Sequence, residues 1–215
     1  NYTAADVPSL SHCMSAGEKL ADAVLNNFEQ RFQLMIYEGL GMSECSYYIS
    51  HPPKQKTDVE PREKRSATGK VQPGHKVGLL DANTLQPVEV GQEGMICIHR
   101  DDPGLFLGYW NQPEKDQSAF SGDWFLTGDF AYQDEDDYVY FLGRKDDLIN
   151  SFGFRVSPNE VERVLKDLDS IAECCVVGQE ISPQKNLVTA VVVKKPGTEL
   201  DEQRVLSYAA DRLAG

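Results

Sequence analysis

The sequence predicts a multidomain chain of mixed α/β and α+β class, because its pattern changes twice along 215 residues. A segment of helix and strand comes first and passes into a β-rich, barrel-like unit with mostly antiparallel strands. After about residue 147 the expected order becomes strand, helix, strand, strand, helix, which is typical of a small α+β unit. We therefore expect a boundary at the charged run from Arg144 to Asp147.

The first part is expected to begin with an amphipathic helix at residues 15–32, whose apolar residues recur at helical spacing. These residues are Leu20, Val24, Leu25, Phe28 and Phe32. A short buried strand, "QLMIYEGL", should follow and run into a loop punctuated by glycine. From about 68 to 142, short apolar runs separated by Gly, Pro and acidic turns predict the β-rich unit.

The last part has a clear helix start at Ser157, Pro158 and Glu160, because Ser caps a helix and Pro fits its first turn. The apolar stripe of this helix consists of Val161, Val164, Leu165 and Leu168. Two strands are expected at 171–179 and 187–195, followed by a helix within 198–215. Four of its residues are expected to face inward, namely Leu206, Ala209, Ala210 and Leu213.

Composition excludes several classes of function. The formal net charge of −13 repels phosphates, so the chain is a poor general ligand for nucleic acid or anionic membranes. No apolar run approaches the roughly 18 residues of a membrane-spanning helix, and no signal peptide is visible. Five cysteines without a CxxC pair indicate neither a disulfide framework nor a zinc site. We expect a cytoplasmic protein without membrane insertion, and the oligomeric state stays open.

The stretch "LGMSE", Leu40 to Glu44, has residue types suited to a nucleotide site. The glycines Gly39 and Gly41 would let the backbone approach a flat ring or a phosphate. Ser43 could donate to a phosphoryl oxygen, and Glu44 could hold Mg²⁺, which prefers carboxylate and phosphate oxygens. The alternative is an ordinary strand-to-turn segment.

Three further motifs allow a functional and an ordinary interpretation. "SAGEKL" could present backbone groups to a nucleobase or simply cap a helix. Asp129, after a glycine at the end of an apolar strand, could accept ribose hydroxyls, although Gly-Asp is common in turns. Arg144 could pair with a ribose or phosphate oxygen, or form a surface ion pair that contributes little.

In this order the motifs resemble the latter part of the adenylate-forming, AMP-binding enzymes, acyl- and aryl-CoA synthetases among them. The matching stretches are "SAGEKL", "YEGLGMSE", "GLFLGYWNQPE", "DWFLTGDF" and "GRKDDLINSFGFRVSPNEVE", and they cover roughly residues 10 to 200. The resemblance implies that 1–143 is the C-terminal part of a large nucleotide- and acyl-binding domain. It also implies a hinge at 144–147 and a small mobile domain at 148–215.

The resemblance also implies residue roles. The nucleotide-binding residues would be Gly17, Glu18, Leu40, Gly41, Ser43, Asp129 and Arg144. Gly17 and Glu18 would lie beside the adenine, and Leu40 takes the place of an aromatic residue that stacks on it. Ser43 would contact the α-phosphate and Glu44 would hold Mg²⁺, so both count as catalytic. Asp129 and Arg144 would contact the ribose.

For the small domain the resemblance implies that Asp146 is the hinge residue. Gly153 and Arg155 would face the active site in the thioester-forming state, where Gly153 lets the pantetheine of CoA pass.

The implied activity is that of an acid–thiol ligase using ATP, Mg²⁺ and CoA, which activates a carboxylic acid as acyl-AMP and transfers it to CoA. The acid is left open between aryl and short- to medium-chain acyl. The alternatives are an adenylation domain that loads a carrier protein, a non-catalytic AMP-binding module and a purely structural piece. The family's upstream phosphate loop and downstream catalytic lysine have no match here, so we expect a fragment that cannot form an acyl-adenylate alone.

Overall fold

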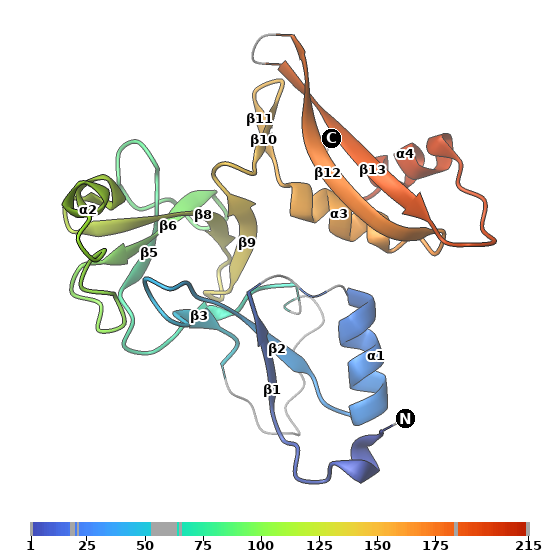
Figure 1. Ribbon diagram of the computed structural model, residues 1–215, viewed down its shortest axis with the longest axis horizontal. Coiled ribbons are helices and arrows are strands. Elements are labelled where there is room, and N and C mark those ends of the chain that lie inside the picture. The colour runs from blue at the N-terminus through green and yellow to red at the C-terminus, as the bar shows by residue number, and fades with distance from the viewer. Residues whose placement is uncertain are drawn as a thin grey trace. The chain divides into compact units, whose positions relative to one another are not determined.

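The computed structural model describes residues 2–17, 20, 22–52, 64, 66–182 and 185–213 (Figure 1). The chain divides into two compact units. Unit 1 consists of Asn1–Leu20 and Val24–Phe141, and unit 2 of Ala21–Ala23 and Leu142–Gly215. Among the residues described, no helix has the length and apolar character needed to span a membrane.

The elements from the N-terminus to the end of β9 are mostly short strands. They are η1 (Ala4–Asp6), β1 (Cys13–Ala16), α1 (Asp22–Phe32), β2 (Ile36–Leu40), β3 (Ile49–Ser50), β4 (Lys70–Val71), β5 (Val77–Leu80), β6 (Gly94–His99), α2 (Pro113–Ala119), β7 (Phe120–Ser121), β8 (Trp124–Gln133) and β9 (Val139–Arg144).

These strands form two sheets in unit 1. In the first, of order β1-β2-β3-β4, β1 runs parallel to β2 and the other pairs are antiparallel. The second has the order β5-β6-β8-β7, with β9 paired to β8. Its pairs β5–β6, β6–β8 and β7–β8 are antiparallel, which confirms the predicted β-rich unit.

The helix expected at 15–32 is wrong in its first part. Residues Cys13–Ala16 pair with β2 as a strand, and α1 begins only at Asp22. Gly17, with φ +102°, has a backbone conformation that an α-helix does not allow. Pairing with β2 thus overrides the helical spacing that the sequence suggested.

One core serves both sheets of unit 1. It is formed by Cys45, Tyr48, Ile49, Ile96, Ile98, Phe125, Ala131 and Val139. Ile49 comes from β3 of the first sheet, whereas Ile96 and Phe125 come from β6 and β8 of the second. The loop between β2 and β3, which carries the candidate site, is therefore anchored at Cys45 and Tyr48 in this shared core.

Unit 2 places two hairpins and two helices in sequence. They are β10 (Ile149–Ser151), β11 (Phe154–Val156), α3 (Pro158–Lys166), β12 (Ile171–Ser182), β13 (Lys185–Lys194) and α4 (Glu202–Ala210). The predicted helix start is confirmed, because Ser157 is the N-cap of α3 and its Oγ accepts from the Glu160 amide at 3.3 Å. The predicted stripe from Val161 to Leu168 is buried, and α3 packs on β12 (Figure 1).

The predicted inward face of the last helix is wrong in part. Leu206 is 61% exposed and Ala210 is exposed, whereas Val205, Tyr208 and Ala209 pack against the core of unit 2. Both sets have the spacing i, i+3, i+4, so periodicity alone could not choose between neighbouring faces. Packing decides the face.

Candidate functional site

The carboxyl ends of β1 and β2 lie at the same sheet edge because the two strands are parallel. Ala16 stands opposite Gly39 in this pair, so the segments starting at Gly17 and Leu40 leave the sheet side by side. Such edges are where open α/β sheets bind their ligands. The structure therefore brings together Gly17, Leu40 and Gly41, three of the predicted nucleotide-binding residues. Glu18 lies outside the described residues.

Ser43 and Glu44 follow in the loop after β2. Ser43 is exposed and Glu44 is half-buried. The Tyr109 hydroxyl donates to Glu44 Oε1 at 2.7 Å, and the Phe106 amide donates to the Glu44 carbonyl at 2.7 Å. A carboxylate held in this way, next to an accessible hydroxyl, has the donor chemistry that suits Mg²⁺ and phosphate oxygens.

Gly39, near the end of β2, and Gly41, in the loop after it, both lie close to Tyr47. A Cβ on Gly39 would lie 2.7 Å from the Tyr47 ring, and one on Gly41 would lie 2.4 Å from the Tyr47 nitrogen. Tyr47 itself has φ +56°. The glycines thus let the loop fold back on itself, and the flat ring that approaches them belongs to the chain.

A hollow of about 510 Å³ opens beside this loop and is lined by His12, Met14, Tyr37, Tyr47, Ser50, His51 and Gln72. Met14 and Tyr37 are register partners on β1 and β2. Gln72 Nε2 donates to Ser50 Oγ at 2.9 Å, which fixes one polar group in the wall. A largely apolar and aromatic wall with a few placed polar groups is the usual make-up of a small-molecule pocket.

Glu38 is a positioning residue that sequence reasoning missed. It is 9% exposed in the middle of β2, and its Oε1 accepts from the Leu20 amide at 2.8 Å. This contact ties Leu20, just before α1, to β2. The available signal was a single carboxylate inside the apolar run "LMIYEGL".

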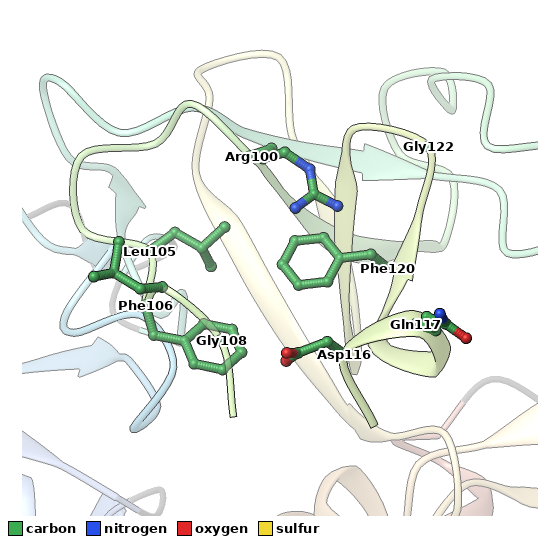
Figure 2. A pocket seen from close by; sticks show the side chains of 9 residues that line it. Arg100, Leu105, Phe106, Gly108, Asp116, Gln117, Phe120 and Gly122 are labelled. Carbon is green, nitrogen blue, oxygen red and sulfur yellow. The ribbon is translucent and has the colours of Figure 1, made fainter. Parts of the chain in front are cut away.

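A second hollow, of about 450 Å³, lies under the loop that carries Phe106 and Gly108 (Figure 2). The Arg100 guanidinium carbon is 4.1 Å from the centroid of the Phe120 ring, a cation–π contact. Asp116 points into the same space. None of these residues was predicted to be functional, because they come from separate turns of the β-rich unit.

One group of described residues, Cys45, His75 and Asp102, has ligand atoms within 4.8 Å of one another, the arrangement that could hold a metal ion. Hydrogen bonds already occupy it: Asp102 accepts from His75 Nδ1 at 3.0 Å and from the Lys76 and Gly104 amides. Burial, and then the nearby Asp102, raises the pKa of the Cys45 thiol to about 11. Because metals bind the thiolate, this cluster is better explained as a hydrogen-bonded support for the loops around it.

Asp129 lies within β8 and not at the end of a strand, which corrects the expected position. The pairing of β6 with β8 shifts register here, from Met95 opposite Phe130 to Cys97 opposite Leu126. Gly128, with φ +77°, makes this bulge possible. The Asp129 amide donates to Thr127 Oγ1 at 3.0 Å, and the residue is 4% exposed. Bulges of this kind redirect a side chain out of the regular alternation of a strand.

The charged run at the boundary forms an exposed turn in unit 2. The amides of Asp147 and Leu148 both donate to the Arg144 carbonyl, at 3.0 and 3.1 Å. The side chains of Arg144 and Asp146 are exposed. This turn follows Phe141, the last residue of unit 1.

Gly153 and Arg155 lie on the β10–β11 hairpin of unit 2. Phe152 and Gly153 have φ +50° and +92°, the two positive values of a type I′ hairpin turn. Among the residues that the structure describes, no atom lies within 4 Å of a Cβ built on Gly153, which stands at the hairpin tip. Phe152 and Phe154 on either side are 57% and 73% exposed.

Comparisons with known proteins identify the family to which the chain is similar. Residues 1–110 match the family model described as AMP-binding enzyme, and residues 160–215 match the AMP-binding enzyme C-terminal domain. The rat (Rattus norvegicus) mitochondrial acyl-coenzyme A synthetase ACSM3 is 38% identical over 202 residues, which are 92% of this chain and 33% of that protein.

Two solved structures are also similar. ATP-bound MatB from Rhodopseudomonas palustris has a TM-score of 0.85 and 30% identity, over 99% of this chain and 41% of that one. The anthranilate CoA ligase AuaEII, in complex with anthranoyl-AMP, has a TM-score of 0.81 and 29% identity, over 97% and 39%. The chain thus spans about a third of the length of the curated relatives it matches. By its family models, relatives and fold, the chain belongs to the AMP-binding enzymes, in the group of adenylate-forming acyl- and aryl-CoA synthetases.

Proposed function

We propose that this protein acts as an ATP-dependent acid–CoA ligase. One observation carries the proposal: Ser43 and Glu44 follow the shared carboxyl edge of the parallel pair β1–β2, with the Glu44 carboxylate held by a 2.7 Å hydrogen bond. Related proteins named acyl-coenzyme A synthetase and anthranilate CoA ligase support the same reaction class.

The proposed reaction has two steps. A carboxylate oxygen of the acid attacks the α-phosphorus of ATP, the bond to the pyrophosphate oxygen breaks, and acyl-AMP forms. The sulfur of CoA, having lost its proton, then attacks the acyl carbon, and AMP leaves with the electron pair of the broken C–O bond. The products are a thioester, AMP and pyrophosphate.

In the first step the adenine would lie at the edge formed by Gly17, Leu40 and Gly41. Ser43 would donate its hydroxyl proton to an α-phosphate oxygen, where negative charge develops. Glu44 would hold Mg²⁺, which when bound neutralises charge on the phosphates. The bulge at Gly128 would direct Asp129 toward the ribose hydroxyls.

In the second step unit 2 would present another face to the same nucleotide. Arg144 would contact the ribose, and the turn at Asp146 would absorb the rotation of the small domain. An exposed turn suits this role because it stays solvated in either state. Gly153, where a Cβ would meet none of the described atoms within 4 Å, would leave room for pantetheine, with Arg155 beside it.

The hollow beside Tyr47 would form part of the acid-binding pocket. Its wall of Met14, Tyr37 and Tyr47 suits an aromatic ring or a short to medium acyl chain, which apolar contacts would hold.

The test uses the purified natural polypeptide that contains residues 1–215. Benzoates and short- to medium-chain fatty acids are screened for acid-dependent exchange between ATP and pyrophosphate, and for thioester formation with CoA. Glu44→Gln should lower exchange about a hundredfold or more, since a metal ligand worth several kcal/mol is lost. Glu114→Gln, at an exposed position in the first turn of α2, is the control and should keep full activity.

Each rival function predicts a different result. Exchange without a CoA thioester, but with acylation of a carrier protein, would indicate the carrier-loading alternative. AMP binding by calorimetry without any exchange would indicate a non-catalytic module. Full activity of Glu44→Gln would refute the role assigned to this loop.

A further inference from the structure

The loop that contains Phe106 and Tyr109 holds Glu44 at two points. The Phe106 amide donates to the Glu44 carbonyl at 2.7 Å, and the Tyr109 hydroxyl donates to Glu44 Oε1 at 2.7 Å. An antiparallel β-bridge between Cys45 and Leu105 joins the same two segments. The backbone and the carboxylate of Glu44 are therefore both oriented by one loop, which lies 65 residues away in the sequence.

Tyr109 is itself held from several directions. The Lys115 ammonium lies 3.9 Å from the centroid of its ring, and the Phe106 ring meets it edge-on at 4.8 Å. The Tyr109 amide donates to Asp116 Oδ1 at 2.8 Å. Figure 2 shows Phe106, Gly108 and Asp116 around the adjoining hollow.

Gly108 makes this arrangement possible. Its φ of +135° favours glycine, and a Cβ there would lie 2.9 Å from Asp116 Oδ2. Tyr109 is thus fixed by its backbone and by the contacts of its ring with Lys115 and Phe106, so its hydroxyl is presented to Glu44 with little freedom.

The direction of the hydrogen bond is also fixed. The Tyr109 hydroxyl is the donor in this pair, and the Glu44 carboxylate oxygen accepts. The hydrogen bond thus orients the carboxylate group to which a cation would bind.

We propose that Tyr109 is a positioning residue for the Mg²⁺ site, which holds the Glu44 carboxylate in the orientation that binds the metal ion with ATP. This inference rests on the proposed function of Glu44. Partners that hydrogen-bond to metal-ligating carboxylates typically contribute ten- to a hundredfold to metal affinity or activity. Tyr109 is 65 residues distant in sequence, so no local pattern around "LGMSE" reveals it.

The test compares Tyr109→Phe with the wild type in the natural polypeptide. The Mg²⁺ concentration for half-maximal ATP–pyrophosphate exchange should rise about tenfold or more, while KM for the acid should change less than about twofold. Mn²⁺ binding in the presence of ATP, followed by electron paramagnetic resonance, should weaken by a similar factor and does not depend on turnover. A general loss of structure would instead raise the half-maximal Mg²⁺ concentration and the KM for the acid together.

Tyr140→Phe is the matched control. The Tyr140 hydroxyl also donates to a carboxylate, Asp134 Oδ2 at 3.0 Å. That carboxylate has no assigned role in the reaction. Tyr140→Phe should therefore leave the Mg²⁺ and Mn²⁺ dependence unchanged.

The outcomes separate this inference from the proposed function. If Glu44→Gln weakens Mn²⁺ binding and Tyr109→Phe does not, Glu44 keeps its role and the positioning role of Tyr109 is refuted. If neither variant changes Mn²⁺ binding, Glu44 is not the metal ligand, and both proposals fail. If Tyr140→Phe weakens binding as much as Tyr109→Phe, the effect is not specific to the site and the inference is also refuted.

Discussion

Replacing Asp102 should destabilise unit 1 strongly, because this buried carboxylate accepts hydrogen bonds from two backbone amides and a histidine ring. Its side chain is 0% exposed and accepts from the Lys76 amide at 2.5 Å, the Gly104 amide at 2.8 Å and His75 Nδ1 at 3.0 Å. Leu105, which bridges to Cys45 beside the candidate site, follows in the same loop.

The magnitude follows from the donors that Asp102→Ala would leave unpaired. A buried donor without a partner costs about 1–3 kcal/mol, and His75 can partly turn to water because its side chain is 16% exposed. We expect a loss of about 3–5 kcal/mol in the free energy of unfolding, which is a large share of the roughly 5–15 kcal/mol of a typical domain. Asp102→Asn keeps one acceptor oxygen and should lose about 1–3 kcal/mol.

Urea unfolding followed by tryptophan fluorescence measures this loss in the right unit, since both tryptophans, Trp110 and Trp124, lie in unit 1. Asp101→Ala is the control. Its side chain is 71% exposed and its ion pair with Lys76 spans 3.8 Å, so its effect should stay below about 0.5 kcal/mol. A change of less than about 1 kcal/mol for Asp102→Ala would refute the reasoning.

The same carboxylate should make unit 1 sensitive to acid. Burial raises the pKa of Asp102, but hydrogen bonds from the Lys76 and Gly104 amides and the charge and hydrogen bond of His75 outweigh it, so that pKa lies below its usual 3.8. A carboxyl group whose pKa is lower in the folded state stabilises that state at pH values above its pKa in the unfolded chain. This stabilisation is lost as the pH falls through the pKa of the folded state. The difference between wild type and Asp102→Asn should therefore shrink from pH 7 to pH 3. An unchanged difference would contradict this assignment.

Two predictions concern unit 2. Ser157→Ala removes the cap of α3 and the bond that Ser157 donates to the Leu142 carbonyl, so stability should fall by about 1 kcal/mol and exchange of the Glu160 amide should quicken about fivefold. Equal protection of the Glu160 amide in the wild type and in Ser157→Ala would contradict this capping role. Asp146→Pro restricts the proposed hinge by fixing φ, so it should impair one of the two steps, adenylate formation or thioester formation, far more than the other. Asp146→Ala should impair neither step. Equal loss of both steps would argue against a hinge.

Elements that depend on neighbouring residues were predictable. The start of α3 follows from Ser157 accepting from an amide three residues on, and the stripe from Val161 to Leu168 follows from helical spacing. The family could be identified because its motifs are short, local and ordered. Strand pairing was harder: Cys13–Ala16 form β1 and pair with β2, although the spacing of apolar residues predicted a helix from residue 15.

The candidate site shows the same division. The sequence alone determined which residue types stand in the loop from Leu40 to Glu44, and hence the prediction that this loop binds phosphate and Mg²⁺. Only the tertiary structure decided that Tyr47 occupies the space beside Gly39 and Gly41, and that Tyr109 donates to Glu44.

The physical reason is the range of the interactions. A cap or a periodic face is decided within one or two turns of the chain, whereas the contact of Tyr109 with Glu44 joins residues 65 apart and that of Cys45 with Asp102 joins residues 57 apart. Such contacts exist only after two sheets share one core, which brings their loops together. The sequence by itself thus determined the family and the local chemistry, and the packing of unit 1 decided which side chains orient that chemistry.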